Sequence, residues 1–430
     1  MKIGMISLGC AKNLVDSEWV LGLLKKEGHQ IIDEIEVADA IIINTCGFIV
    51  DSKKESIQTI FDVIDKKQDN AFLIVIGCLA KRYKEELLKE IPEIDLIIGV
   101  DEYAHIGSLL NSVLKTSLPS TFNTQNRVLS SYLPIAYLKI GEGCSNCCAY
   151  CAIPLIRGPY YSYKKEDILN EAQYLISIGV KELVIIAQDT TRYGKDIYCN
   201  YHLHHLLQDI ASLDKKVYIR LLYLYPDRIS DELIQVFKQN DNIFPYFDIP
   251  IQHSSNSLLK QMNRTGNREL YLEVIQKIKK EIPHAVFRTT LILGFPGETQ
   301  EDFEDVKQFI KEVEFDHLGA FVFSNEEDTK AFTMKPKVSK KIATQRKNEI
   351  MKIQQQISYQ KNKNRINQTQ LVLIEDYDGN NYYGRSYVYA PDDVDGFVIV
   401  KSEKKLFIGD YVKVKITKAY AYDIEGEALN

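Results

Sequence analysis

The sequence predicts an α/β protein in three parts: a doubly wound parallel-sheet domain, a partial (β/α)6 barrel and a small antiparallel β-barrel. Short apolar runs alternate with helical patterns over the first hundred residues, and the alternation resumes from Ile135 with six candidate strands. From about Thr369, short strands and turns replace it. At 430 residues the chain is too long for one ordinary core, so two or three domains are expected.

The first domain is predicted to span residues 1–116. Three strand-like runs rich in Ile and Val begin it, KIGMISLGC, AIIINTCG and FLIVIGC. A helix opened by Asp16 or Ser17 and closed by Gly28 lies between the first two runs, and a second helix is predicted at 51–67. Residues 117–134, with Ser, Thr, Asn and Pro, are predicted to form a linker.

The second domain is predicted to span residues 135–340. Helical patterns such as 165–179 and 268–281 separate its six strands, as expected for a barrel that is left open on one side. The predicted strands are 136–140, 182–187, 217–222, 246–251, 286–293 and 318–323.

The remaining residues carry charges of opposite sign. A helix is predicted at 341–366, and residues 340–365 hold eight Lys or Arg and one Glu, a net charge of +7. This segment is either a solvated linker helix or a basic contact surface. The predicted barrel at 367–430 holds seven Lys or Arg and eleven Asp or Glu, a net charge of −4.

The composition is that of an ordinary globular protein. No apolar run reaches the roughly 18 residues that span a bilayer, and the N-terminus reads as a first strand, so we expect a cytoplasmic protein without a membrane contact. In that compartment, clustered cysteines indicate metal or redox chemistry more than disulfides. The net charge of −6 gives no global preference for nucleic acid.

Three cysteines each follow a predicted strand directly: Cys10, Cys46 and Cys78. The carboxyl ends of parallel strands lie along one edge of a sheet, where ligands bind, so the three thiols are expected to converge on a metal or cluster. The alternative is three buried cysteines that act as small hydrophobic residues.

Four more cysteines crowd into GEGCSNCCAYC, residues 141–151, after the first barrel strand. The loop offers either Cys144, Cys148 and Cys151 or Cys144, Cys147 and Cys151 as a trio. A zinc ion would need four ligands, with Cys199 as a distant fourth, whereas a cluster on three thiolates would leave one iron open to a substrate.

The pattern C-x3-C-x-aromatic-C after the first strand of a partial barrel resembles the radical S-adenosylmethionine (radical SAM) enzymes. The resemblance selects Cys144, Cys148 and Cys151 as ligands of a 4Fe–4S cluster, with Tyr150 as the aromatic residue. Cys147 is then a bystander.

Flanking motifs narrow the resemblance to the methylthiotransferase family: SLGCAKNLVDSE, INTCGFIVDSKKESI and IGCLAKRY near the N-terminus, then AQDTTRYG, YFDIPIQHSSNSLLKQMNRTG and RTTLILGFPGET. The resemblance implies a second, auxiliary 4Fe–4S cluster on Cys10, Cys46 and Cys78, and a C-terminal TRAM barrel. CGFI, AQDTTRYG and DIPIQHSS resemble the branch that modifies an aspartate of ribosomal protein S-twelve, not the sister branch that modifies adenosine in transfer RNA.

The resemblance also implies a chemistry. S-adenosylmethionine bound to the open iron would yield a deoxyadenosyl radical that removes hydrogen from the substrate carbon. Sulfur at the second cluster and a methyl group from another S-adenosylmethionine would complete the product.

Five residues are expected to bind the cofactor: Tyr150, Gln188, Asp189, Arg220 and Gly294. Asp189 suits an ammonium group, but it equally suits a helix N-cap, and Arg220 can instead form a buried ion pair. Arg157 is a candidate partner for anionic groups, Tyr163 stands where the family pattern has Arg, and no catalytic residue is identified.

Charge gives a second argument about the substrate. An acidic C-terminal barrel suits a basic partner such as a ribosomal protein more than RNA. The basic helix allows a contact with ribosomal RNA, and a reductase or flavodoxin-type electron donor is expected as a further partner. Methylthiolation of transfer RNA and a nucleic-acid-binding protein with structural zinc remain the alternatives.

Overall fold

The computed structural model describes residues 1–119, 127–130, 134–392 and 394–429. The chain forms two compact units, one of Met1–His202 with Ser324–Phe332 and the other of Leu203–Phe323 with Thr333–Asn430. Parts of the predicted linker, 120–126 and 131–133, lie outside the described residues.

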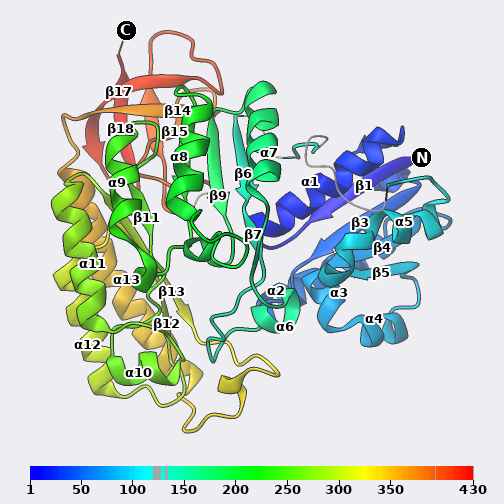
Figure 1. Ribbon diagram of the computed structural model, residues 1–430, viewed down its shortest axis with the longest axis horizontal. Coiled ribbons are helices and arrows are strands. Elements are labelled where there is room, and N and C mark those ends of the chain that lie inside the picture. The colour runs from blue at the N-terminus through cyan, green and yellow to red at the C-terminus, as the bar shows by residue number, and fades with distance from the viewer. Residues whose placement is uncertain (120–126, 131–133, 393, 430) are drawn as a thin grey trace. The chain divides into compact units, whose positions relative to one another are not determined.

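The first unit begins with a five-stranded parallel sheet, drawn in blue and cyan in Figure 1. The order across the sheet is β2 (Gln30–Ile32), β1 (Lys2–Ser7), β3 (Ala40–Thr45), β4 (Phe72–Gly77) and β5 (Leu96–Gly99). The prediction of a doubly wound sheet is confirmed, and the two short edge strands β2 and β5 are additions to it. The helices are α1 (Ala11–Lys26), η1 (Ile35–Val37), α2 (Val50–Ile64), α3 (Cys78–Arg82), α4 (Lys84–Glu90), η2 (Val100–His105) and α5 (Ile106–Leu114).

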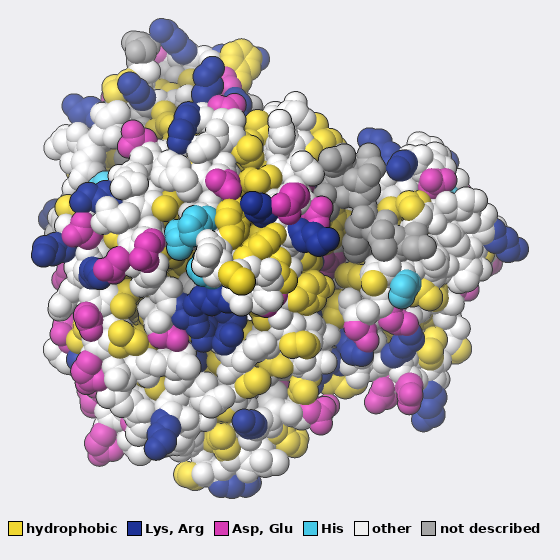
Figure 2. Space-filling model, in the orientation of Figure 1, with side chains coloured by type: hydrophobic (Ala, Val, Ile, Leu, Met, Phe, Trp, Pro, Cys, Tyr) yellow, Lys and Arg dark blue, Asp and Glu magenta, His cyan; other side chains and the backbone are white. Residues whose placement is uncertain are grey.

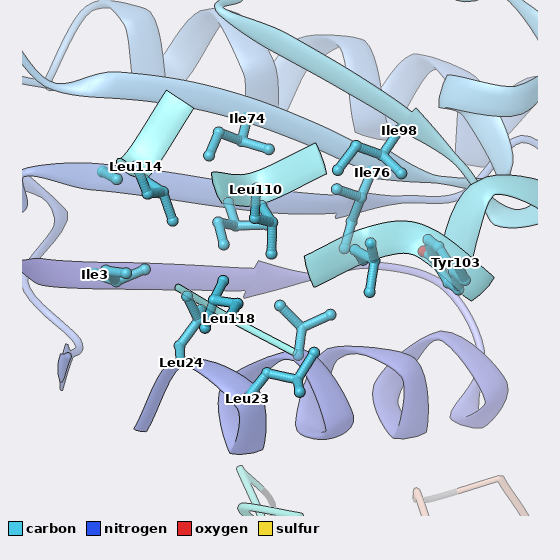
Figure 3. Close-up of a cluster of buried hydrophobic side chains, with 14 residues drawn as sticks. Ile3, Leu23, Leu24, Ile74, Ile76, Ile98, Tyr103, Leu110, Leu114 and Leu118 are labelled. Carbon is cyan, nitrogen blue, oxygen red and sulfur yellow. The ribbon is translucent and has the colours of Figure 1, made fainter. Parts of the chain in front are cut away.

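Helices cover both faces of this sheet, because the strands are apolar on both sides. Ile42, Ile74 and Ile76 face α1 and α5, and Figure 3 shows Ile74, Leu24 and Leu110 pointing into one shared core. The alternate strand residues Ile43 and Val75, among others, pack against α2, α3 and α4 on the other face. Each such fully buried side chain contributes on the order of 1.5–3 kcal/mol of transfer free energy.

Helix α1 begins earlier than the sequence predicts. It starts at Ala11, directly after Cys10, instead of at Asp16 or Ser17. Asp16 and Ser17 are fully buried inside the helix, where they bind other side chains rather than cap a helix end.

The six predicted barrel strands are all present, each close to its predicted position. β6 (Ile135–Lys139) and β9 (Glu182–Ile186) pair in parallel in the first unit. That unit also contains β7 (Gly141–Glu142), α6 (Ile153–Arg157), β8 (Tyr161–Ser162), α7 (Lys165–Ser177), η4 (Thr190–Arg192) and η6 (Lys330–Phe332).

In the second unit, β11 (Tyr246–Asp248), β12 (Val286–Leu293) and β13 (His317–Val322) form a parallel sheet. Strand β10 (Tyr218–Leu221) precedes them along the chain. The helices between and after these strands are α8 (Leu203–Leu213), η5 (Pro226–Arg228), α9 (Asp231–Gln239), α10 (Asn256–Gln261), α11 (Arg268–Glu281) and α12 (Gln300–Val313).

The predicted basic helix is α13 (Lys340–Lys363), and one of its faces is buried while the opposite face stays exposed. Ala343, Arg346, Ile350, Gln354 and Ser358 form part of its buried face. The guanidinium of Arg346 lies 2.6 Å from Glu298, so one of the predicted surface charges is neutralised inside the protein.

The C-terminal strands close into a barrel in the order β14, β15, β16, β18, β17. Their bounds are β14 (Thr369–Tyr377), β15 (Tyr382–Arg385), β16 (Val398–Lys401), β17 (Tyr411–Ala419) and β18 (Ile424–Ala428), drawn in orange and red in Figure 1. One pairing, β16 with β18, is parallel and the others are antiparallel.

The segment between β15 and β16 packs against the barrel strands of the second unit. The guanidinium of Arg220 donates to the carbonyl oxygens of Ser386 and Tyr387 at 3.2 and 3.1 Å. Asp395 accepts from the hydroxyl of Tyr246 at 2.5 Å and pairs with Arg288 at 3.1 Å. The C-terminal barrel is therefore joined to its unit by buried polar contacts.

Candidate cluster-binding site

Cys10, Cys46 and Cys78 lie at the carboxyl ends of three neighbouring strands, β1, β3 and β4. Cys10 is exposed at the N-terminus of α1, whereas Cys46 and Cys78 are buried. This is the edge of a parallel sheet at which ligands bind.

Two glycines allow the cysteine loops to approach one another. A Cβ atom on Gly9 would lie 2.7 Å from Cβ of Cys46, and Gly9 has a φ of +88° that suits only glycine. A Cβ atom on Gly47 would lie 3.0 Å from the carbonyl carbon of Cys78. Neither glycine therefore has room for a side chain beside the neighbouring cysteine.

Asn13, in the first turn of α1, contacts the loops of all three cysteines. Its Nδ2 donates to the carbonyl oxygens of Leu8 and Thr45 at 3.0 and 3.1 Å, and Sγ of Cys78 lies 3.6 Å from its Oδ1. The side chain therefore ties the ends of β1 and β3 to the first residue of α3.

The thiols of this trio affect one another. Burial raises the pKa of Cys46, and it raises the pKa of Cys78 to about 12; smaller contributions come from Cys10 in both cases. Cysteines bind iron as thiolates, so loading a cluster here would release protons.

The second group of cysteines lies between β7 and α6. Cys144 and Cys148 are buried, Cys151 is half-buried and Cys147 is exposed with a φ of +52°. The backbone N–H of Cys151 donates to the carbonyl oxygen of Cys148 at 3.0 Å, which folds the end of the loop into a turn. Of the two adjacent cysteines, Cys148 therefore lies inside the loop and Cys147 points outward.

A buried network of charges joins this part of the chain to α1. Arg157 donates to Glu142 at 2.6 Å and to Asp16 at 3.0 Å, and Lys139 pairs with the same two carboxylates. Burial alone would raise the pKa of Glu142, but the charges of Arg157 and Lys139 hold it at about 2. The anionic partners of Arg157 are thus carboxylates of the protein itself.

Beside this network lies a cavity of about 850 Å³ in the first unit. Asp16, Lys139 and Glu142 line it, together with the rings of Trp19 and Tyr163. None of the cysteines is among the described residues that line it. Tyr163 stands near the cation of Lys139, with 5.8 Å between Nζ and the ring centroid.

Gln188 and Asp189 follow β9, and Asp189 contacts Asn146 of the second cysteine loop. Nε2 of Gln188 donates to Glu142 at 2.6 Å, and its Oε1 is buried without a hydrogen-bond partner among the described residues. Asp189 is fully buried and accepts from Thr191 N, as the N-cap of η4, and from Asn146 at 2.8 Å. The N-cap alternative for Asp189 is therefore observed, and the open acceptor belongs to Gln188.

Asn146 connects this strand end to the cysteine loop. Its Nδ2 lies 3.5 Å from Sγ of Cys144, and its Oδ1 accepts from Arg192 at 2.8 Å. Hydrogen bonds to sulfur ligands are one means by which proteins set a cluster's potential.

The other predicted cofactor residues have different settings. Tyr150 is half-buried in the cysteine loop of the first unit. In the second unit, Arg220 is fully buried on the carbonyl oxygens described above, and Gly294 has a φ of +80° and packs against Ala343 of α13. Their roles toward a cofactor stay predictions.

Across 1–119, 127–130, 134–392 and 394–429, no three His, Cys, Asp or Glu side chains are grouped as ligands of one metal ion. In a 4Fe–4S cluster each thiolate binds a different iron, so its cysteines stand farther apart. One trio lies at three neighbouring strand ends and the other within the loop 144–151, and we compare both with that arrangement.

The sequence did not reveal Asn13, Asn146 or Glu142 as parts of the site. Asn13, Asn146 and Glu142 each stand within three residues of a predicted cysteine ligand, and this proximity is the signal that could have indicated them. The distant partners of Glu142, which are Arg157 and Gln188, by contrast carry no pattern that links them to it.

Family models match three stretches of the chain. Residues 2–99 match the uncharacterized protein family UPF0004, residues 138–310 match the radical SAM superfamily and residues 366–429 match the TRAM domain.

Solved structures share the fold at low sequence identity. TsrM, a radical S-adenosylmethionine methyltransferase from Kitasatospora setae, superposes with a TM-score of 0.56 at 11% identity over 74% of this chain and 72% of its own. The cobalamin-dependent radical enzyme OxsB gives 0.53 at 13% identity over 72% of this chain and 51% of its own. The predicted barrel fold is therefore confirmed.

Full-length relatives are much more similar. Ribosomal protein uS12 methylthiotransferase RimO from Thermoanaerobacter sp. (strain X514) is 48% identical over 99% of both chains. The protein of the same name from Clostridioides difficile (strain 630) is 48% identical over 100% of this chain and 99% of its own. The chain belongs to the family of ribosomal protein uS12 methylthiotransferases within the radical SAM superfamily.

Proposed function

We propose that this protein methylthiolates the β-carbon of an aspartate in ribosomal protein uS12 by radical SAM chemistry. The observation that carries the proposal is near-complete coverage at 48% identity by proteins named ribosomal protein uS12 methylthiotransferase. The relatives do not favour the transfer-RNA alternative.

Two 4Fe–4S clusters and S-adenosylmethionine are the cofactors that the radical SAM match and the named relatives imply. Cys144, Cys148 and Cys151 would hold the cluster that takes S-adenosylmethionine, and Cys10, Cys46 and Cys78 the auxiliary one. When bound, these groups would supply the deoxyadenosyl radical and the sulfur that is transferred. The buried Cys148 and the exposed Cys147 support this choice within the second loop.

The chain's own residues would orient the cofactor. Oε1 of Gln188 offers a buried acceptor for the amino group of S-adenosylmethionine, since its Nε2 is already held by Glu142. Asp189 would act mainly through Asn146, which it fixes beside Cys144. Tyr150, Arg220 and Gly294 complete the proposed cofactor residues.

The substrate uS12 is the proposed partner, and the acidic C-terminal barrel suits a basic protein. On the face shown in Figure 2, basic and acidic side chains are interspersed. A contact between the exposed lysines of α13 and ribosomal RNA is proposed as secondary, because Arg346 and Arg365 of the basic stretch are buried in ion pairs.

A reductase or flavodoxin-type protein would supply electrons. Across the described ranges, no helix combines the length and the apolar character that crossing a bilayer requires. We propose a cytoplasmic location because the proposed substrate is a ribosomal protein.

The test compares cells with and without the gene. Mass spectrometry of uS12 should find the methylthio group on one aspartate only when the gene is present, while transfer-RNA nucleosides stay unchanged. A methylthioadenosine that disappears with the gene, beside an unchanged uS12, would replace this proposal by the transfer-RNA activity.

A further inference from the structure

Residues 324–332, here called the strap, follow β13 and belong to the first unit. The strap has its own internal hydrogen bonds. The hydroxyl of Ser324 donates to Oε1 of Glu326 at 2.7 Å, and the hydroxyl of Thr329 donates to the carbonyl oxygen of Glu326 at 2.7 Å. Glu326 is therefore held in one conformation by its neighbours.

Glu326 binds two helices near cysteines of the first trio, α2, which begins shortly after Cys46, and α3, which begins at Cys78. Its Oε1 accepts from the backbone N–H of Val50, the first residue of α2, at 2.9 Å. Its Oε2 accepts from Nζ of Lys53 at 2.9 Å and lies 3.4 Å from Arg82 of α3. Helix α2 starts four residues after Cys46.

Arg82 also connects the strap to the loop that follows Cys46. Its NH1 donates to the carbonyl oxygen of Gly47 at 3.0 Å, and its NH2 donates to the carbonyl oxygen of Glu327 at 3.2 Å. Because Gly47 is next to Cys46, one side chain bridges the strap and the loop of an auxiliary-cluster cysteine.

The other end of the strap binds the second cysteine loop. The backbone N–H of Ala331 donates to the carbonyl oxygen of Ala149 at 2.8 Å, and both residues are buried. Ala149 lies between Cys148 and Cys151. Within nine residues, the strap thus contacts loops from both cysteine trios.

Burial distinguishes Glu326 from an ordinary surface ion pair. Its side chain is 2% exposed, with Lys53 at 14% and Arg82 at 6%. Exposed pairs contribute little, whereas the loss of one partner from a buried pair is strongly destabilising locally. Burial alone would raise the pKa of Glu326, but hydrogen bonds from Ser324 and Lys53 lower it, so it is an anion at neutral pH.

We propose that Glu326 is a positioning residue that fixes the loop after Cys46 relative to the loop around Ala149, and thereby couples sulfur transfer to radical formation. This rests on the proposed function, in which the substrate carbon meets both cofactors. Reacting atoms must approach to about 3–3.5 Å, and a shift of about 1 Å can cost on the order of 100-fold in rate.

The test compares Glu326→Gln with Asp328→Asn in the full-length, cluster-loaded enzyme. Glu326→Gln removes the charge that Lys53 and Arg82 bind, at nearly constant volume. Asp328 is exposed two residues away, and Asn suits its φ of +62°, so its variant removes a charge from the strap without touching the contact.

For Glu326→Gln we expect unchanged iron and sulfide content. Pulsed electron paramagnetic resonance on the two reduced clusters should give a broader distribution of distances than in the wild type. The ratio of deoxyadenosine released to methylthiolated uS12 should rise about 10-fold or more, because radicals form without productive transfer. Asp328→Asn should match the wild type in all three measurements.

A Glu326→Gln enzyme with the wild-type distance distribution and the wild-type ratio would overturn the proposal. Should that variant not fold, Lys53→Met removes one donor only and should change the same two readouts less; unchanged readouts there would also overturn it. The distance measurement needs no substrate, so a failure of the proposed uS12 activity in the wild type is recognised separately.

Discussion

The guanidinium of Arg157 donates to Oδ1 of Asn13 at 2.6 Å. Arg157 ends the helix that follows the second cysteine loop, and Asn13 lies one turn after Cys10. This hydrogen bond joins the segment behind one cysteine trio to the residue that braces the other, so the two predicted cluster sites are mechanically connected through buried polar groups.

Replacing Arg157 by Met should be strongly destabilising. Asp16 and Glu142 would keep only Lys139 as a cationic partner, and an uncompensated buried charge costs about 3–5 kcal/mol. Urea unfolding measures the change in the free energy of unfolding. Lys81→Met removes an exposed pair with Asp101 and should change that free energy by less than about 1 kcal/mol.

Cys148 and Cys147 are adjacent but should differ in effect. Cys148→Ala should lose one cluster, about four irons per chain, because the buried Cys148 is the predicted ligand. Cys147→Ala should keep the full iron and sulfide content, since this thiol is exposed. Iron analysis of anaerobically reconstituted protein is the measurement, and the reverse pattern would show that the ligand trio contains Cys147.

Gln188→Leu should weaken the binding of S-adenosylmethionine by about 10-fold, which corresponds to the loss of one buried hydrogen bond of about 1.4 kcal/mol. Its Oε1 is the buried acceptor, and leucine offers none. Isothermal titration of the cluster-loaded variant measures the dissociation constant. Iron content is the control, and an unchanged constant would remove Gln188 from the proposed cofactor residues.

The stability of the second unit should depend on pH through His253. Burial lowers the pKa of this fully buried imidazole to about 4. The unfolded chain, with a pKa of about 6.5, binds the proton more strongly, so the contribution is complete above about pH 6.5 and is lost down to about pH 4.

The total loss over that window is about 3 kcal/mol. The check is the free energy of unfolding as a function of pH for the wild type and for His253→Gln, which cannot titrate. The difference between the two curves should follow this window. Parallel curves would mean that the imidazole is protonated equally in both states.

The sequence predicted the strands well because their signal is local. Runs such as Ile41–Ile43 and Leu73–Ile76 are apolar at every position, as a short strand covered on both faces requires. The short strands β2 and β5 escaped prediction because three or four residues carry too little pattern.

The start of α1 was misplaced for a physical reason. Asp16 and Ser17 have the residue types of an N-cap, but tertiary partners at Arg157 and Ser7 override that preference. Asp and Ser are typical of helix N-caps, but they also occur as buried side chains that bind distant residues. Sequence alone does not separate the two cases.

The cysteines of the candidate site were predictable because their spacing is unusual, whereas their supports were not. Glu326 meets Val50 across 276 residues of chain, and nothing near either residue indicates the contact. The burial of Arg346 and Arg365 could not be predicted either. A run of basic residues has the same sequence pattern whether its side chains are solvated or paired with distant carboxylates.

The contacts of the segment 386–395 bear on how the enzyme can be dissected. Arg220 is solvated by backbone oxygens that only the C-terminal barrel provides, and Arg288 relies on Asp395 from the same segment. Truncation before β14 would remove those acceptors from both guanidinium groups. The activity of a shortened enzyme would therefore reflect a damaged catalytic domain and would not measure the contribution of the C-terminal barrel by itself.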